Sequence, residues 1–415
     1  MRNSHWNRPM SLSWRFTAPF LFAGLLCAQT PISGSGPNGG VIMFNSDLAV
    51  LEAGEVRKDV PCSVTPVKPE LGFDLKFHAG YDVTLPMADV AGKENLLTIL
   101  FRVTPENRTE HPTYFIQRVR VPLLDENIKG DAFLQGGFDL GEGNYHVDWL
   151  MRDRSDRVCA DNWDTEAVLA PKDKGVALVI AAGAVQRSAS DQFNEEPPVE
   201  RAQGEEPLNV KVLINFAPQN ALSAALQPVD TTALISILRG ISREPRIGKF
   251  SITAFNMQEG KIVYRQLDAD RIDFPALGKA LDSLNLGTVD VKRLGEKHGD
   301  TNFLADLIQK EVAGDGDRHP DAVIFAGPKV MLEANVPQES LRQVGGVDFP
   351  VFYMNYNLYP QAVPWKDAIS HTVKYFRGTE YTISRPRDLW FAVSDLVTRV
   401  VKSRNGKRSA AISTH

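Results

Sequence analysis

The spacing of apolar positions changes near residue 200 and divides the chain into two parts. From residue 41 to about residue 170, apolar and polar positions alternate in short runs, such as 71–78 and 144–151. Alternation with a period of two is typical of strands that bury one face. Turn residues separate the runs, and none has the length and period of a convincing helix. The pattern predicts a β-sandwich over residues 41–187, with a last strand at 176–185.

One turn in this part has a more specific form. Residues 140–145 read Leu-Gly-Glu-Gly-Asn-Tyr, and Tyr145 begins an alternating run. This resembles the corner before a late strand of immunoglobulin-like domains, where a tyrosine hydroxyl reaches back to the backbone. A glycine-rich hairpin before any strand has a similar sequence, so two interpretations stay open. The first of them makes the sandwich immunoglobulin-like.

Beyond residue 209 the runs lengthen and alternate between two periods. Apolar runs predict strands at residues 210–216, 250–255, 262–266, 322–326 and 351–355. Runs with a helical period predict helices at residues 229–241, 274–284, 302–312, 337–344, 368–375 and 387–401. Strands separated by helices predict a mainly parallel sheet that is covered on both faces. We therefore expect an α/β doubly wound domain over residues 209–403, with ligand sites at the carboxyl ends of its strands.

Three further segments are predicted to lie outside the two domains. Residues 29–40 are rich in glycine, proline and serine, which predicts a flexible leader. Residues 188–208 are acidic and contain proline, which predicts a linker between the domains. Residues 404–415 follow the last helical run and are expected to form a tail.

The first 28 residues have the pattern of an export signal. Arg2, Arg8 and Arg15 supply positive charge, residues 16–26 are apolar, and Ala28 offers a small residue for cleavage. The alternative is a buried N-terminal helix. The apolar run is shorter than the about 20 residues that span a bilayer, and no later apolar run reaches that length. We predict an exported protein, periplasmic or extracellular, that does not span the membrane.

Charge and cysteine content agree with export. The formal net charge is −5, and loss of the three arginines takes it to −8. Binding to nucleic acid needs a concentrated basic surface, so this class of function is excluded. Cleavage leaves two cysteines, Cys62 and Cys159. In an oxidising compartment these form one disulfide or stay as two buried thiols, and the sequence leaves both states open.

The order of elements over residues 210–401 resembles a von Willebrand factor type A domain. Residues 249–256 and 261–264 resemble the second and third strands of that family, which form a hairpin at one edge of the sheet. Residues 299–302, Gly-Asp-Thr-Asn, resemble its Gly-x-Thr loop. A β-rich region ahead of a divergent type A domain resembles exported proteins predicted in soil bacteria such as acidobacteria.

The resemblance implies a divalent metal at the strand tips, bound by Asp-x-Ser-x-Ser after the first strand. In this chain Asn215, Ala217 and Gln219 stand at those positions. A hard cation prefers oxygen ligands that include carboxylates, because these offset its charge. Neutral amides cannot offset it. We therefore expect a degenerate site with no metal, in which Asn215 and Gln219 bind a polar ligand or cap the loop and the next helix.

The remaining ligand positions of the family are mostly lost as well. Thr301 matches the middle-loop threonine, with Asp300 beside it, but Ala326 or Gly327 stands where the family has an aspartate after the fourth strand. We assign Asp300 and Thr301, with Asn215 and Gln219, to the degenerate strand-tip site. No cofactor is expected there.

Two other groups of residues have functional interpretations. His298 and Asp300 fall on one predicted strand-tip loop, which suits an acid–base pair but is also typical of solvated loop side chains. Tyr356, Tyr359 and Trp365 lie in a proline-containing loop, and such aromatic side chains are common in protein interfaces.

These observations favour a non-enzymatic, exported protein-interaction module. The expected partner is another protein of the envelope or the extracellular space. The alternatives are an exported hydrolase that uses His298 and Asp300, and a structural envelope component. The sequence contains no phosphate loop, dinucleotide fingerprint, Gly-x-Ser-x-Gly or His-Glu-x-x-His motif to support a specific enzyme.

Overall fold

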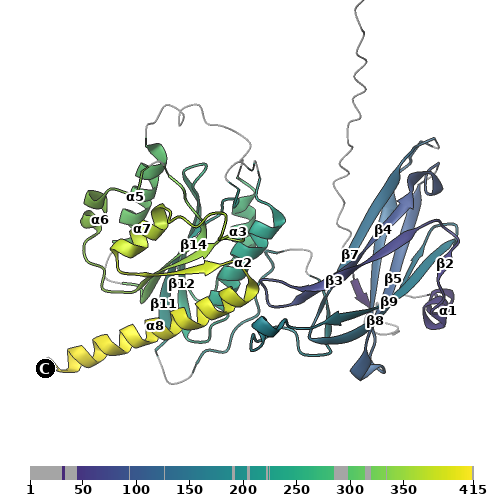
Figure 1. Cartoon of the computed structure of the whole chain (residues 1–415), viewed down its shortest axis with the longest axis horizontal. Coiled ribbons are helices and arrows are strands. Elements are labelled where there is room, and N and C mark those ends of the chain that lie inside the picture. Colours follow the sequence, from purple (N-terminus) through teal and green to yellow (C-terminus); the bar gives the residue numbers. More distant parts are fainter. Residues whose placement is uncertain are drawn as a thin grey trace, which may run out of the picture.

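Two antiparallel sheets face each other in the N-terminal part of the computed structural model (Figure 1). The larger sheet has the order β1-β6-β5-β8-β9-β2, and the smaller has β10-β7-β4-β3. Their strands are β1 (Thr30–Ile32), β2 (Arg57–Lys58), β3 (Ser63–Leu71), β4 (Phe77–Pro86), β5 (Asn95–Pro105), β6 (Thr113–Val121), β7 (Asp131–Leu140), β8 (Gly143–Arg152), β9 (Val158–Ala167) and β10 (Val185–Arg187).

The structure describes residues 30–32 and 44–413, with gaps at 93, 126, 189–191, 203–205, 221–222, 224, 285–297, 314–318 and 333. The predicted signal peptide lies outside the described residues. Among those that are described, no helix has the length and apolar character needed to cross a bilayer.

Aromatic side chains fill the space between the two sheets. Tyr81 on β4 meets Phe101 on β5 edge-on, with ring centroids 5.3 Å apart, and meets Trp149 on β8 at 5.5 Å. All three side chains are fully buried. Alternate residues of each strand point into this core, as the period-two pattern predicts.

Three local features differ from the sequence-based prediction. Residues 30–32 of the predicted leader form β1, which pairs with β6. Helix α1 (Asn45–Ala53) was not expected; its Leu51 packs with Leu100 and Leu150 on the outer face of the larger sheet. Residues 176–184 do not form a strand, since Gly175 and Gly183 adopt positive φ angles and turn the chain there, and the last strand of the sandwich, β10, begins only at Val185.

The turn at residues 141–145 makes the hydrogen bond that defines a tyrosine corner. The Tyr145 hydroxyl donates a hydrogen bond of 2.8 Å to the Gly141 carbonyl, four residues back. Tyr145 is fully buried, and burial raises its pKa to about 12. A side chain at Gly141 would place its Cβ 1.9 Å from the Ala181 carbonyl oxygen, so only glycine fits at the corner.

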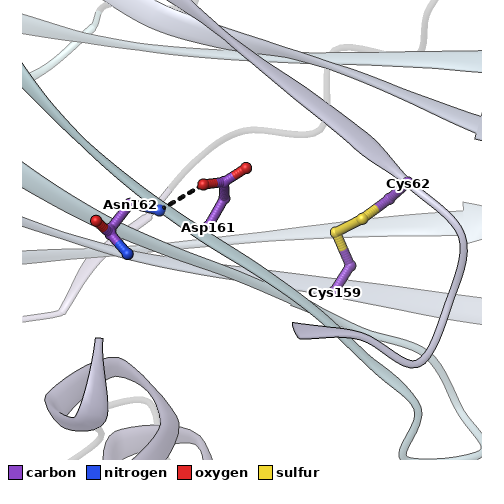
Figure 2. The surroundings of a disulfide bond; sticks show 4 residues. All are labelled: Cys62, Cys159, Asp161 and Asn162. Carbon is purple, nitrogen blue, oxygen red and sulfur yellow. Dashed lines mark hydrogen bonds between the residues drawn. A yellow bond between two sulfur atoms is a disulfide. The ribbon is translucent and has the colours of Figure 1, made fainter. Parts of the chain in front are cut away.

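A disulfide joins Cys62 to Cys159, which is one of the two states that the sequence left open (Figure 2). It connects the start of β3 in the smaller sheet to β9 in the larger one. The two cysteines are 97 residues apart in the chain. A crosslink over a long loop restricts the unfolded chain strongly, so it stabilises the folded sandwich.

The C-terminal part is built on a six-stranded sheet with the order β13-β12-β11-β14-β15-β16. The strands are parallel except β13, which forms an antiparallel hairpin with β12 at one edge. The elements are β11 (Leu208–Asn215), α2 (Pro228–Ser242), β12 (Ile247–Asn256), β13 (Lys261–Ala269), α3 (Phe274–Leu281), α5 (Gly299–Val312), β14 (Ala322–Pro328), α6 (Gln338–Val344), β15 (Val351–Tyr356), α7 (Ala368–Tyr375), β16 (Thr379–Ile383) and α8 (Pro386–Ser413).

Helices cover both faces of this sheet, as predicted. Apolar side chains of α2, α3 and α8 pack with one set of alternate strand residues, and those of α5, α6 and α7 pack with the other set. The central strands β11 and β14 are buried on both faces, which explains their continuous apolar sequences.

Two predicted boundary segments belong to this α/β domain instead. Residues 404–413 are not a separate tail, because α8 continues to Ser413, as Figure 1 shows in yellow. The described part of the predicted linker lies along α2. There Glu196 forms ion pairs with Arg239 at 2.8 Å and Arg243 at 2.7 Å, which hold it against the helix.

Replacing both Cys62 and Cys159 with serine is expected to lower the free energy of unfolding by about 2–4 kcal/mol, since the unfolded chain regains the freedom that the crosslink removes. Urea denaturation measures this loss. A reducing agent should lower the stability of the wild-type protein by a similar amount and leave the double variant unchanged. Equal stability of the two oxidised proteins would contradict the prediction.

Candidate functional site

The carboxyl ends of β11, β14 and β15 lie side by side at one end of the parallel strands, which we call the strand-tip edge. They bring together Asn215, Gly327 and Tyr356, and the loops that follow them. Most of the predicted site residues lie along this strand-tip edge, where parallel sheets place their ligand sites.

Asn215 is buried and already occupied by a structural bond. Only 1% of it is exposed, and its side-chain oxygen accepts a 3.1 Å hydrogen bond from the Met257 amide. Gly327 on the neighbouring strand has a φ of 140°, and a Cβ there would lie 2.8 Å from the Asn215 Cβ. The Asn215 side chain therefore connects the ends of β11 and β12, and Gly327 on β14 packs against it.

Gln219 has a comparable structural role. Its side-chain amide donates to the Asn357 side chain at 3.3 Å, and Asn357 in turn donates to the Val363 carbonyl at 3.3 Å. Asn357 also accepts from the Tyr359 amide at 3.1 Å. These bonds connect the loop after β11 to the loop after β15 and fix the shape of the latter.

The residues predicted to form the Gly-x-Thr loop are the first residues of helix α5. Thr301 is buried, and its hydroxyl donates to the Ala334 carbonyl at 3.2 Å. His298 precedes the helix in a left-handed conformation, and Asp300 lies in the first turn; both side chains are exposed.

These residues do not fit a divalent metal. The Asn215 oxygen accepts from Met257, the Thr301 hydroxyl donates to a carbonyl, and Ala217 offers no ligand atom. A cation at the strand tips would need carboxylates to offset its charge, and the chain has neutral side chains at the matching positions after β11 and β14.

Tyr356 is a core residue, which corrects its assignment to the interface. It is the last residue of β15. Its side chain lies on the same face as those of Phe352 and Met354, in the core that α2, α3 and α8 cover. Burial raises its pKa well above the ordinary value, and the nearby Asp230 carboxylate raises it further. Burial also raises the pKa of Asp230, against the hydrogen bonds that it accepts from backbone amides.

The other two aromatic residues are exposed beside this edge. Tyr359 is 67% exposed and Trp365 is 63% exposed, both on the loop after β15. Met331, on the loop after β14, is 56% exposed. The Lys329 ammonium joins the two loops by donating to the Val363 and Trp365 carbonyls. We call Met331, Tyr359 and Trp365 the tip surface.

A second polar cluster lies on the sandwich. His78 on β4 bonds Asp139 on β7 through Nδ1 and Asp74 through Nε2, both at 2.9 Å. The Lys76 ammonium donates to Asp139 at 3.2 Å. Asp139 is 1% exposed, so its charge depends on these partners.

The two carboxylates keep His78 protonated. Burial alone would lower its pKa, but the hydrogen bonds to Asp139 and Asp74 and their negative charges raise it to about 10. For Asp74, burial acts to raise the pKa, but the hydrogen bond with His78, the positive charges of His78 and Lys76 and the hydrogen bond from the Lys76 backbone together lower it. The negative charges of Asp74 and Asp139 are therefore balanced by the positive charges of His78 and Lys76.

The same geometry opposes a metal in the cluster, although its three ligand atoms lie within 4.8 Å of one another. The carboxylates bond opposite nitrogens of the ring, and an imidazolium has no free lone pair. The neighbouring Lys76 adds like charge. This arrangement is suited to holding the β3–β4 turn in place.

Comparisons with known proteins identify no family. No family model matches the sequence, and no curated protein matches it. The PilB minor pilin from Streptococcus sanguinis aligns at 8% identity over 73% of this chain and 87% of its own, with a TM-score of 0.26. Structural genomics target SoR45 aligns at 12% identity over 28% of this chain and 94% of its own, with a TM-score of 0.17.

A glycosyl hydrolase family 2 member from Bacteroides cellulosilyticus DSM 14838 aligns at 14% identity over 76% of this chain, with a TM-score of 0.18. The alignment covers 37% of that hydrolase. TM-scores this low support no conclusion about this chain's fold or activity.

Titration with MgCl₂, MnCl₂ or CaCl₂ is expected to reveal no stoichiometric site tighter than about 1 mM, because the ligand positions after β11 and β14 carry no carboxylate. Isothermal titration calorimetry of the wild-type protein measures this. Thr301→Ala is the matched variant. A one-to-one binding event that disappears in Thr301→Ala would overturn the assignment of a degenerate site.

Replacing His78 with glutamine should remove a pH-dependent part of the stability. The pKa of His78 is raised on folding, so its contribution is fully present below about pH 6.5 and is lost as the pH rises through about 10. The difference in unfolding free energy between wild type and His78→Gln is therefore expected to shrink over this range. Urea denaturation at several pH values measures it, and a constant difference would contradict the assigned charge.

Proposed function

We propose that this chain is an exported protein-binding module in which the tip surface of a type A-like domain contacts a partner protein without a metal ion. An immunoglobulin-like sandwich precedes that domain. The strand order, with an antiparallel hairpin at one edge and helices on both faces, supports the type A-like assignment. The tyrosine corner supports the assignment of the sandwich.

This proposal rests on the exposure of the tip surface. Met331, Tyr359 and Trp365 are each more than half exposed, although they are large and apolar. Tyrosine and tryptophan are enriched among the residues that dominate binding energy in protein interfaces. Hydrogen bonds through Lys329 and Asn357 hold the two loops in shape, so little ordering is needed when a partner binds.

The bonds beneath the tip surface explain how it works without a metal. In a metal-dependent site the strand-tip side chains are available to bind the ion. Here Asn215, Gln219 and Thr301 each bond a neighbouring loop or strand. Their function in this proposal is to support the loops, while the exposed side chains above them make the contact.

The disulfide supports export. Disulfides persist in oxidising compartments such as the periplasm and the extracellular space and are rare in the cytosol. Cys62 and Cys159 are bonded between the two sheets of the sandwich. The partner in this proposal is therefore a protein of the envelope or the extracellular space.

Replacing Tyr359 and Trp365 together with serine is expected to weaken partner capture at least about tenfold, since each side chain is of the kind that costs more than 1 kcal/mol when truncated in an interface. Affinity capture from the native envelope fraction, with a chelator present, measures this. Phe391→Ser is the control, because Phe391 is 55% exposed on α8. Equal capture by the double variant and the control would contradict the proposal.

A further inference from the structure

Backbone hydrogen bonds fix the turn between β3 and β4. Within residues 72–76, the Gly72 amide donates to the Lys76 carbonyl at 2.8 Å, and the Leu75 amide donates to the Gly72 carbonyl at 2.9 Å. Leu75 has a positive φ of 61°, which is strained for a residue with a side chain. The Leu75 carbonyl accepts from Val179, at 3.0 Å.

The charge cluster ties this turn to the body of the sandwich. Asp74 lies in the turn, whereas His78 and Asp139 are paired residues on β4 and β7. Their bonds through the imidazolium ring therefore connect the turn to two strands of the sheet. Gly72 is packed against the cluster, because a Cβ there would lie 2.4 Å from His78 Nε2.

Phe73, in this turn, contacts the core of the α/β domain. The Phe73 ring meets Tyr356 edge-on, with centroids 6.1 Å apart and planes at 83°. Phe73 also packs against the apolar core between the sheet and α2 and α8, together with the half-buried Leu226 and Leu358. A sandwich residue thus completes the core of the α/β domain, and Figure 1 shows the β3 end reaching toward α2.

A second contact lies near the start of α8. Arg387 donates to the Lys172 carbonyl, in a short 3₁₀ turn (Pro171–Asp173) that follows β9. The core against which Phe73 packs also contains residues of α8, such as Leu389. Two separate segments of the sandwich therefore contact the α/β domain.

We infer that residues 72–76 form an interdomain latch, in which Phe73 seats at the strand tips of the α/β domain and the Asp74–His78–Asp139 cluster holds the turn in the shape that seats it. Domains joined by a small interface move relative to each other by default. The latch opposes this motion because its turn is rigid before it docks, so docking orders few additional groups. This inference does not depend on what the tip surface binds.

Small-angle X-ray scattering of the full chain, wild type against Phe73→Ala, tests the latch. We expect Phe73→Ala to increase the radius of gyration and lengthen the tail of the pair-distance distribution, because the sandwich is released. Phe133→Ala is the matched control, since Phe133 is 77% exposed on the same sheet. Circular dichroism checks that each variant keeps its secondary structure.

A scattering profile of folded Phe73→Ala that superimposes on wild type would overturn the inference. If Phe73→Ala does not fold, the double variant Asp74→Asn, His78→Gln loosens the turn and leaves Phe73 in place. It is expected to shift the profile in the same direction and by less. An unchanged profile for this folded double variant would equally overturn the latch, and Phe73→Leu, which keeps an apolar side chain, should retain the wild-type profile.

Discussion

The hydrogen bond from the Met257 amide to the Asn215 side chain organises the strand-tip edge of the α/β domain. It is fully buried, so breaking it would leave a polar group unpaired at a cost of about 1–3 kcal/mol. It connects the ends of β11 and β12, and Gly327 packs against the same side chain from β14. An aspartate that bound a metal from this position would have to give up this role or share it.

The tip surface depends on this rigid edge. Gln219 and Asn357 connect the loops after β11 and β15, and Lys329 connects the loops after β14 and β15. Exposed aromatic side chains on mobile loops lose entropy when a partner binds, whereas those on fixed loops lose little. In our account the polar residues at the strand tips support a surface, and apolar residues above them form it.

The sequence predicted most of the architecture because the relevant signals are local. Alternation of period two marked the sandwich, continuous runs marked the buried parallel strands, and Gly141 to Tyr145 marked the corner whose hydrogen bond forms. Helix α1 was missed because its apolar face is narrow and packs on a sheet distant in sequence. Tyr356 was assigned to the interface because the sequence places it in the proline-containing loop, but it is the last residue of β15, and all six residues of this strand are buried.

The site was less predictable, because its parts come from separate segments. Met331 reaches the tip surface only through the pairing of β14 with β15, and no local pattern singles it out. The His78 cluster depends on the register that places His78 opposite Asp139, 61 residues away in the chain. The sequence does contain one usable signal, since Asp74 in the hairpin turn and His78 at the start of β4 are only four residues apart.

A photoreactive amino acid at position 365 would detect a partner protein bound at the tip surface. With the variant protein added to the native envelope fraction in the presence of a chelator, irradiation is predicted to cross-link one partner protein from position 365. The same probe at position 391, on the exposed face of α8, is predicted to give no such product. A cross-link that requires divalent metal, or one that forms equally from both positions, would contradict a metal-free binding surface at the strand tips.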